Sequence, residues 1–68
     1  MVDQNKLDSY MIKAGYTQKE LAKELGMTLK TYSLKKTGKG EFKSSEIIMI
    51  SKILNIPKSE VRPTFLVE

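Results

Sequence analysis

The chain has 68 residues, of which 40% are apolar and 29% charged, a composition that predicts one small folded domain and excludes a disordered, collagen-like or disulfide-stabilised chain. It contains no cysteine and no histidine, the residues that supply thiolate and imidazole groups to metal and catalytic sites. We therefore expect no enzyme, no metal and no cofactor. The net charge is +4, and the segment from Thr28 to Lys43 carries all of it with five lysines and one acid, which predicts attraction to polyanions such as nucleic acids.

The first predicted helix follows Asp3, whose carboxylate can accept hydrogen bonds from the free N–H groups of the opening turn. Leu7, Met11 and Ala14 are expected to form its buried stripe. Gly15 ends this helix, because glycine enters the left-handed conformation at little cost.

Thr17 begins a second helix, with Glu20 three residues later as its capping-box partner. Its apolar face consists of Leu21, Ala22 and Leu25, and Gly26 closes it. Thr28 then opens a third helix. Most residues of this third helix are polar, which predicts a narrow buried edge and a wide exposed face.

Gly38 and Gly40 end the third helix, and Phe42 is expected to pack back against the core. Ser44 or Ser45 caps a fourth helix, which ends at Asn55 and Pro57 and whose inner side carries Ile47, Ile50, Ile53 and Leu54. A last turn or two from Pro57 to Arg62 precedes Pro63. The segment 64–67 that follows is apolar and β-prone.

Residues 17–37 have the sequence form of a helix-turn-helix: a capped helix, a short turn with glycine and a second capped helix with a polar face. In this motif the first helix braces the phosphate backbone, and the second lies in the major groove, which an α-helix fits. The unit therefore predicts binding to double-stranded DNA.

The stretch from Thr17 to Thr28 (TQKELAKELGMT), followed by Thr31-Tyr32-Ser33 and Gly38, resembles the core pattern of the Cro/C1-type phage repressors. The resemblance covers about residues 7–61, and the segments 32–42 and 45–47 look most like small regulators of phages and mobile elements of Gram-positive bacteria. It implies an all-α, lambda-repressor-like domain of four to five short helices over residues 1–68. Where many members have an aromatic residue and then an acid late in the recognition helix, this chain has Lys35 and Lys36.

The resemblance also implies roles for individual residues in DNA binding. The base-reading residues are expected to be Leu29, Lys30 and Ser33, since lysine suits the guanine O6 and N7 acceptors and leucine suits the thymine methyl group. Leu34 is either a base contact or a core residue, and we expect the core. The expected phosphate-binding residues are Gln18, Thr28, Lys35, Lys36, Lys39 and Lys43.

We expect the protein to be a sequence-specific transcriptional repressor that binds a two-fold operator as a dimer. Without DNA, the two chains are expected to pair only weakly. The tail 61–68 is expected to join two chains through Val61, Phe65, Leu66 and Val67, because the helical core is complete by Ile56. The alternative is that this tail folds back onto the first and fourth helices of its own chain.

The alternative function, from a different class, is a protein-interaction module such as an antirepressor or antitoxin. Such a module would bind a partner protein, for example a repressor. The polar, basic third helix favours DNA, since a protein-binding face is richer in aromatic residues. No apolar run of about eighteen residues could span a membrane, and the start of the chain is too polar for a signal peptide. We therefore expect a cytoplasmic protein with no membrane partner.

Overall fold

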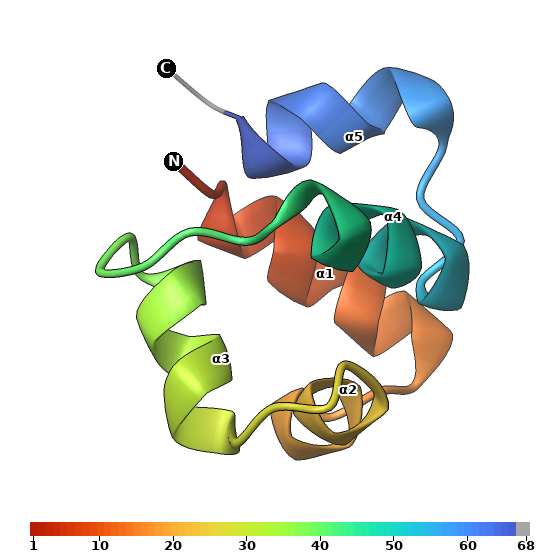
Figure 1. The fold of residues 1–68 in the computed structure, drawn as a ribbon. Coiled ribbons are helices and arrows are strands. Elements are labelled where there is room, and N and C mark those ends of the chain that lie inside the picture. Colours follow the sequence, from red (N-terminus) through yellow and green to blue (C-terminus); the bar gives the residue numbers. More distant parts are fainter. Residues whose placement is uncertain (67–68) are drawn as a thin grey trace.

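The computed structural model describes residues 1–66, and every regular element within that range is a helix. The predicted all-α class is confirmed. Figure 1 shows α2 and α3 at one end of the molecule and α5 at the other, with α1 and α4 between them. The helices are α1 (Gln4–Ala14), α2 (Gln18–Glu24), α3 (Leu29–Lys36), α4 (Ser44–Ile53) and α5 (Lys58–Phe65).

Side-chain caps start the first three helices as predicted. The Asp3 carboxylate accepts the Lys6 N–H at 3.1 Å, and the Thr28 hydroxyl accepts the Thr31 N–H at 3.1 Å. At α2 the capping box is complete, because Thr17 accepts the Glu20 N–H at 3.1 Å while the Glu20 carboxylate accepts the Thr17 N–H at 3.0 Å. These bonds satisfy N–H groups that have no partner within a helix, so they set where each helix begins.

The core draws side chains from all five helices and from the connections between them. Its fully buried apolar members are Leu7, Met11, Leu21, Ala22, Tyr32, Ile50, Leu54, Ile56 and Phe65. Phe42 packs against it as predicted, with its ring centroid 5.8 Å from that of Tyr32 and 5.9 Å from that of Phe65. Ala14, expected in the buried stripe of α1, is exposed, because it stands in the last turn beyond the reach of the core.

The predicted start of α4 is wrong by one or two residues. Its N-cap is Lys43 rather than Ser44 or Ser45. The Glu46 carboxylate accepts the Lys43 N–H at 2.8 Å, so an acid in the first turn, rather than a serine hydroxyl, determines where α4 begins.

The expected end of the last helix at Pro63 is also wrong, because α5 continues through Pro63 to Phe65. Thr64 and Phe65 are buried, and the Thr64 hydroxyl donates to the Glu60 carbonyl at 2.6 Å. The Leu66 N–H donates to the Arg62 carbonyl at 2.8 Å. Burial and these bonds offset the N–H that Pro63 lacks, so residues 64 and 65 are helical rather than extended.

A backbone hydrogen bond joins the beginning of the chain to α5. The Asp3 N–H donates to the Thr64 carbonyl at 2.7 Å, and Figure 1 shows the N-terminal segment beside the last turn of α5. Within residues 1–66, none of the helices has the length and apolar character that a membrane crossing requires.

Candidate nucleic-acid interface

A short turn connects α2 to α3. Leu25 is the C-cap of α2, Gly26 has a φ of 71° in the left-handed region, and the Met27 N–H donates to the Ala22 carbonyl at 3.0 Å. Figure 1 shows α2 end-on and α3 side-on, so the two axes cross at a large angle. The turn therefore holds α3 away from the axis of α2, as a helix-turn-helix requires.

All three residues of α3 that were expected to read bases are exposed. Leu29, Lys30 and Ser33 are exposed, whereas Tyr32 is fully buried. Lys30 and Ser33 lie three residues apart and share the outer face of α3. Leu29 lies three residues before Tyr32, on the side of the buried edge, and is exposed at the first residue of the helix.

Leu34 belongs to the same outer face, so the prediction that it is a core residue is wrong. Its side chain is 40% exposed, and Leu29 is 45% exposed. Leu34 lies two residues from both Tyr32 and Lys36, about 200° around the helix from each, and these two residues form the buried edge. Counting from Tyr32 would have identified Leu34 as an outer residue.

Gln18 and Thr28 lie where their expected roles need them, at the N-terminal ends of α2 and α3, and both are exposed. Helix N-termini present free N–H groups and a partial positive charge to an anion. The Thr28 hydroxyl also bonds to the Thr31 hydroxyl at 3.0 Å, so its capping contacts involve only the chain itself.

The structure contradicts the expected availability of Lys35 and Lys36 for phosphates. The Lys35 Nζ donates to both carboxylate oxygens of Glu46, at 2.7 and 2.9 Å, and the Lys36 Nζ lies 2.7 Å from Asp8 Oδ1. The side chains of Lys35 and Lys36 are only 16% and 8% exposed. Lys36 follows Tyr32 by one helical turn, so its methylene chain covers the core while its ammonium group reaches an acid.

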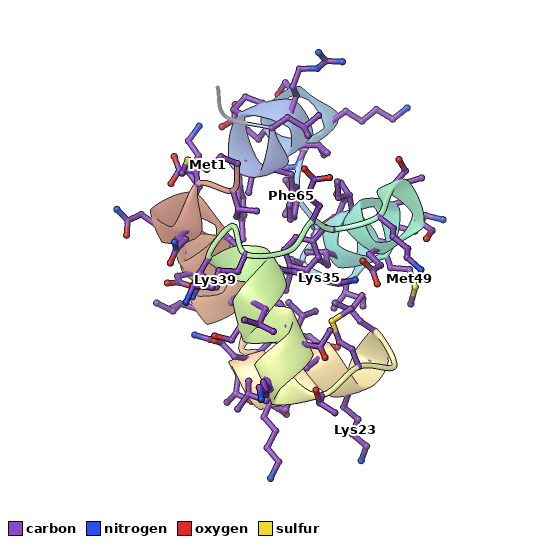
Figure 2. The ribbon with its side chains drawn as sticks, turned by 60° about the vertical axis from the view of Figure 1, so that its left-hand side comes forward. Met1, Lys23, Lys35, Lys39, Met49 and Phe65 are labelled. Atoms are coloured by element: carbon purple, nitrogen blue, oxygen red, sulfur yellow. The ribbon has the colours of Figure 1, made fainter. Side chains whose placement is uncertain are left out.

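Three of the predicted lysines are exposed: Lys30, Lys39 and Lys43. None of them forms an ion pair with another residue of the described range 1–66. Figure 2 shows Lys39 on the connection that follows α3, and Lys35 on the side of α3 that faces α4. Within residues 28–43, the positive charge available to a ligand thus lies on the first turn of α3 and along the connection to α4.

Two ionisable groups near α3 have shifted pKa values. Burial alone would raise the pKa of Glu46, but hydrogen bonds from Lys35 and from the Lys43 N–H, with the charges of both lysines, lower it below its usual value. Burial, and secondarily the charge of Asp8, raises the pKa of Tyr32. Glu46 is therefore ionised and Tyr32 protonated near neutral pH, and the Tyr32 hydroxyl donates to Met11 Sδ at 3.2 Å.

The structure also contradicts the expected exposure of Phe65 as a dimer contact. Phe65 is 3% exposed and packs against Phe42 in its own chain, because α5 folds over the core. Val61 is half-buried in a shallow groove with Ile48 and Ile56, and Leu66 is 52% exposed. The fourth expected contact, Val67, lies outside the described residues.

The chain matches a known protein family. The family model described as helix-turn-helix matches residues 7–61, which is more than half of the chain and includes all of α2, the turn and α3. No curated protein and no solved structure matches the chain significantly.

Proposed function

Because the chain belongs to the Cro/C1-type helix-turn-helix family of DNA-binding transcription regulators, we propose that it binds a two-fold operator sequence-specifically, as a homodimer. The observation that carries this proposal is the outer face of α3. That face stands clear of the core, with Lys30, Ser33 and Leu34 exposed on it, and Lys39 is exposed on the connection after it. An α-helix of this kind enters the major groove, where each base pair presents a distinct pattern of donors, acceptors and methyl groups.

Four side chains of α3 are proposed to read bases. Lys30 donates to guanine O6 and N7, and Ser33 bonds to a neighbouring base edge. Leu29 and Leu34 contact thymine methyl groups. Leu34 joins this set because it is exposed one helical turn after Lys30.

Phosphate contacts are proposed for Gln18, Thr28, Lys39 and Lys43. The first two stand at helix N-termini, and the two lysines are exposed on and after the connection that follows α3. Lys35 and Lys36 are left out of this set because their ammonium groups already face acids of the same chain.

Dimerisation is proposed through the outer surface formed by α4 and α5. Val61, Ile48 and Ile56 line a groove there, and Ile48 and Met49 are 55% and 44% exposed. Leu66 is a further exposed apolar residue of the C-terminal segment. This apolar area is small, so pairing is weak in solution and the operator drives most of it by mass action.

A protein-binding function, as an antirepressor or antitoxin, is the second candidate. The exposed Leu29 and Leu34 would suit a protein partner, whereas Lys30, Lys39 and Lys43 favour DNA. In both cases the chain acts by binding alone, without a catalytic step. A regulator of transcription works where its DNA lies, so the proposal places the chain in the cytoplasm.

The test is a selection of duplexes from a random-sequence library, followed by affinity measurements over a range of salt concentrations. With two phosphate-binding lysines per chain, Lys39 and Lys43, log K should fall against log salt with a slope of about −4 for a dimer. Recovery of one two-fold sequence supports the proposal. A flat salt response, or equal affinity for selected and mixed sequences, contradicts sequence-specific DNA binding.

A further inference from the structure

Apolar packing alone leaves α3 weakly oriented. Of its residues from Leu29 to Lys36, only Tyr32 and Lys36 are buried, so Tyr32 is the single apolar side chain of α3 that is fully inside the core. A helix anchored by one aromatic ring can roll and tilt about that ring unless other contacts oppose the motion. The turn to α2 holds its first residues, and at the other end of α3 two ion pairs, at consecutive residues of the last turn, oppose the motion.

The first ion pair connects α3 to α1. The Lys36 Nζ lies 2.7 Å from Asp8 Oδ1, and the Lys36 side chain is 8% exposed. Asp8 Oδ1 is itself buried and accepts no hydrogen bond from residues 1–66, so the Lys36 ammonium is the group that offsets its charge. Removing Asp8 would leave the Lys36 ammonium unpaired and poorly hydrated, whereas the Asp8 side chain is 42% exposed.

The second ion pair connects α3 to the first turn of α4. Lys35 donates to both oxygens of Glu46, and the two side chains are 16% and 15% exposed. Glu46 simultaneously accepts the Lys43 N–H, which ties the pair to the beginning of α4. Water has little access to this pair, so salt screens it less than it screens an exposed pair.

We propose that Lys35 and Lys36 are positioning residues, which set the rotation of α3 so that its outer face meets the bases, without touching DNA themselves. Consecutive residues point about 100° apart around a helix, and these two are held by different neighbours, α1 and α4. Rolling α3 in either direction therefore stretches one of the two pairs. This inference rests on the proposed function, because it assigns a consequence for DNA recognition to contacts within the chain.

The test compares three substitutions, each of which removes an ammonium group and keeps a linear side chain: Lys35→Met, Lys36→Met and, as the matched control, Lys39→Met. Each variant is measured against the best selected duplex and a mixed-sequence duplex of equal length, at several salt concentrations. Circular dichroism establishes that each is folded at the temperature used. Glu46→Gln breaks the Lys35 pair from its other side, should Lys35→Met fail to fold.

Lys35→Met and Lys36→Met should weaken binding to the selected duplex about tenfold, and binding to the mixed duplex less than about twofold, with an unchanged salt slope. Lys39→Met should weaken both duplexes alike and make the slope shallower by about 0.9 per chain. Exchanging the charges in Asp8→Lys with Lys36→Glu should restore most of the lost preference. Wild-type affinity in the two single variants, or a slope change like that of Lys39→Met, would overturn the inference.

A measurement without DNA separates this inference from the proposed function. Residual dipolar couplings of the backbone N–H groups report the orientation of α3 relative to α1 and α4 in the free chain. The couplings of α3 should change in Lys35→Met and Lys36→Met, and stay unchanged in Lys39→Met. Unchanged couplings in all three refute positioning even if no duplex is ever selected, whereas altered couplings with no selected duplex refute only the proposed function.

Discussion

The five lysines between Thr28 and Lys43 occupy two kinds of environment. Lys35 and Lys36 face acids of α4 and α1, while the other three stand in solvent. Composition cannot separate these two groups, because all five residues have the same charge and similar neighbours in the sequence. The spacing of Lys36 from Tyr32 could have placed it on the buried edge, but its acidic partner comes from a distant segment, which only the fold brings near.

Lys30 should affect specificity, in contrast to a phosphate-binding lysine. We expect Lys30→Ala to lose about 1–3 kcal/mol on the selected duplex and to relax the preference at one base pair, because a base-edge contact is removed. Lys43→Ala should instead weaken all sequences alike. Affinities for single-base variants of the duplex check this, and identical patterns for the two substitutions would show that Lys30 reads no base.

Leu34 offers a sharper test, since its proposed partner is a single methyl group. Leu34→Ala should change the free energy of unfolding by less than about 0.5 kcal/mol, because the side chain is exposed. It should nevertheless weaken binding to a duplex that contains thymine. Replacing each thymine in turn by deoxyuridine removes only the C5-methyl group. At the contacted position, this replacement should lower the affinity of the wild type but not that of Leu34→Ala. Additive losses at every position would show that Leu34 contacts no methyl group.

The lowered pKa of Glu46 predicts how stability depends on pH. Because the folded-state pKa lies below the unfolded value, the unfolded chain binds more protons, so this stabilisation is present above the unfolded pKa and is lost as pH falls through the folded pKa. Urea unfolding at neutral pH and in the acid range measures this effect. Between the two conditions, the free energy of unfolding should fall less for Glu46→Gln than for the wild type. Glu24→Gln, at an exposed position, is the matched control and should behave like the wild type.

At the scale of the helices, local chemistry predicted what local contacts determine. Asp3, Thr17 and Thr28 begin three helices through bonds to residues three positions later, and such bonds can be recognised in the sequence. The start of α4 was missed because its cap is made by the Glu46 side chain to a lysine N–H. The continuation of α5 was missed because it depends on burial of Phe65 among residues from other helices. The helix-turn-helix was therefore predictable, whereas the contacts that orient it were not.

Pro63 allows a direct test of the α5 boundary. We expect Pro63→Ala to raise the free energy of unfolding by about 2 kcal/mol. Removing a proline from inside a helix gains about 3 kcal/mol, but alanine makes the unfolded chain more flexible, which offsets about 0.4–1 kcal/mol of this gain. Pro57→Ala at the N-cap of α5 should bring no gain, since no helical N–H is restored there. Thermal and urea unfolding measure both. If Pro63→Ala brought no gain either, the helix would end before this residue.

At the scale of the whole molecule, the proposed DNA-binding surface and the proposed dimer surface belong to different helices. The exposed lysines of residues 28–43 lie on α3 and the connection after it, while Ile48 and Met49 lie on α4. Figure 2 shows Met49 and Lys39 on opposite sides of the molecule. A dimer that pairs through α4 and α5 thus leaves both copies of α3 free for successive turns of one groove, about 34 Å apart.

Ile48→Glu tests this arrangement. The substitution should leave the chain folded, because Ile48 is 55% exposed, and it should reduce binding of a full two-fold duplex to that of a half-site, because two carboxylates would meet in the apolar interface. Sedimentation with full-length and half-length duplexes measures the stoichiometry. Ile12→Glu is the control, since Ile12 is 79% exposed on α1. Dimeric binding by Ile48→Glu would place the interface elsewhere.

The bond from the Asp3 N–H to the Thr64 carbonyl has a consequence for local opening of the fold. Amide protons near a chain end usually exchange with solvent deuterium almost freely, because terminal segments fray at little cost. Here the Asp3 amide can exchange only when its bond to α5 breaks, so its exchange rate reports the free energy of that opening. Slow exchange at Asp3 would mean that the first residues and the last helix open together, as one cooperative unit.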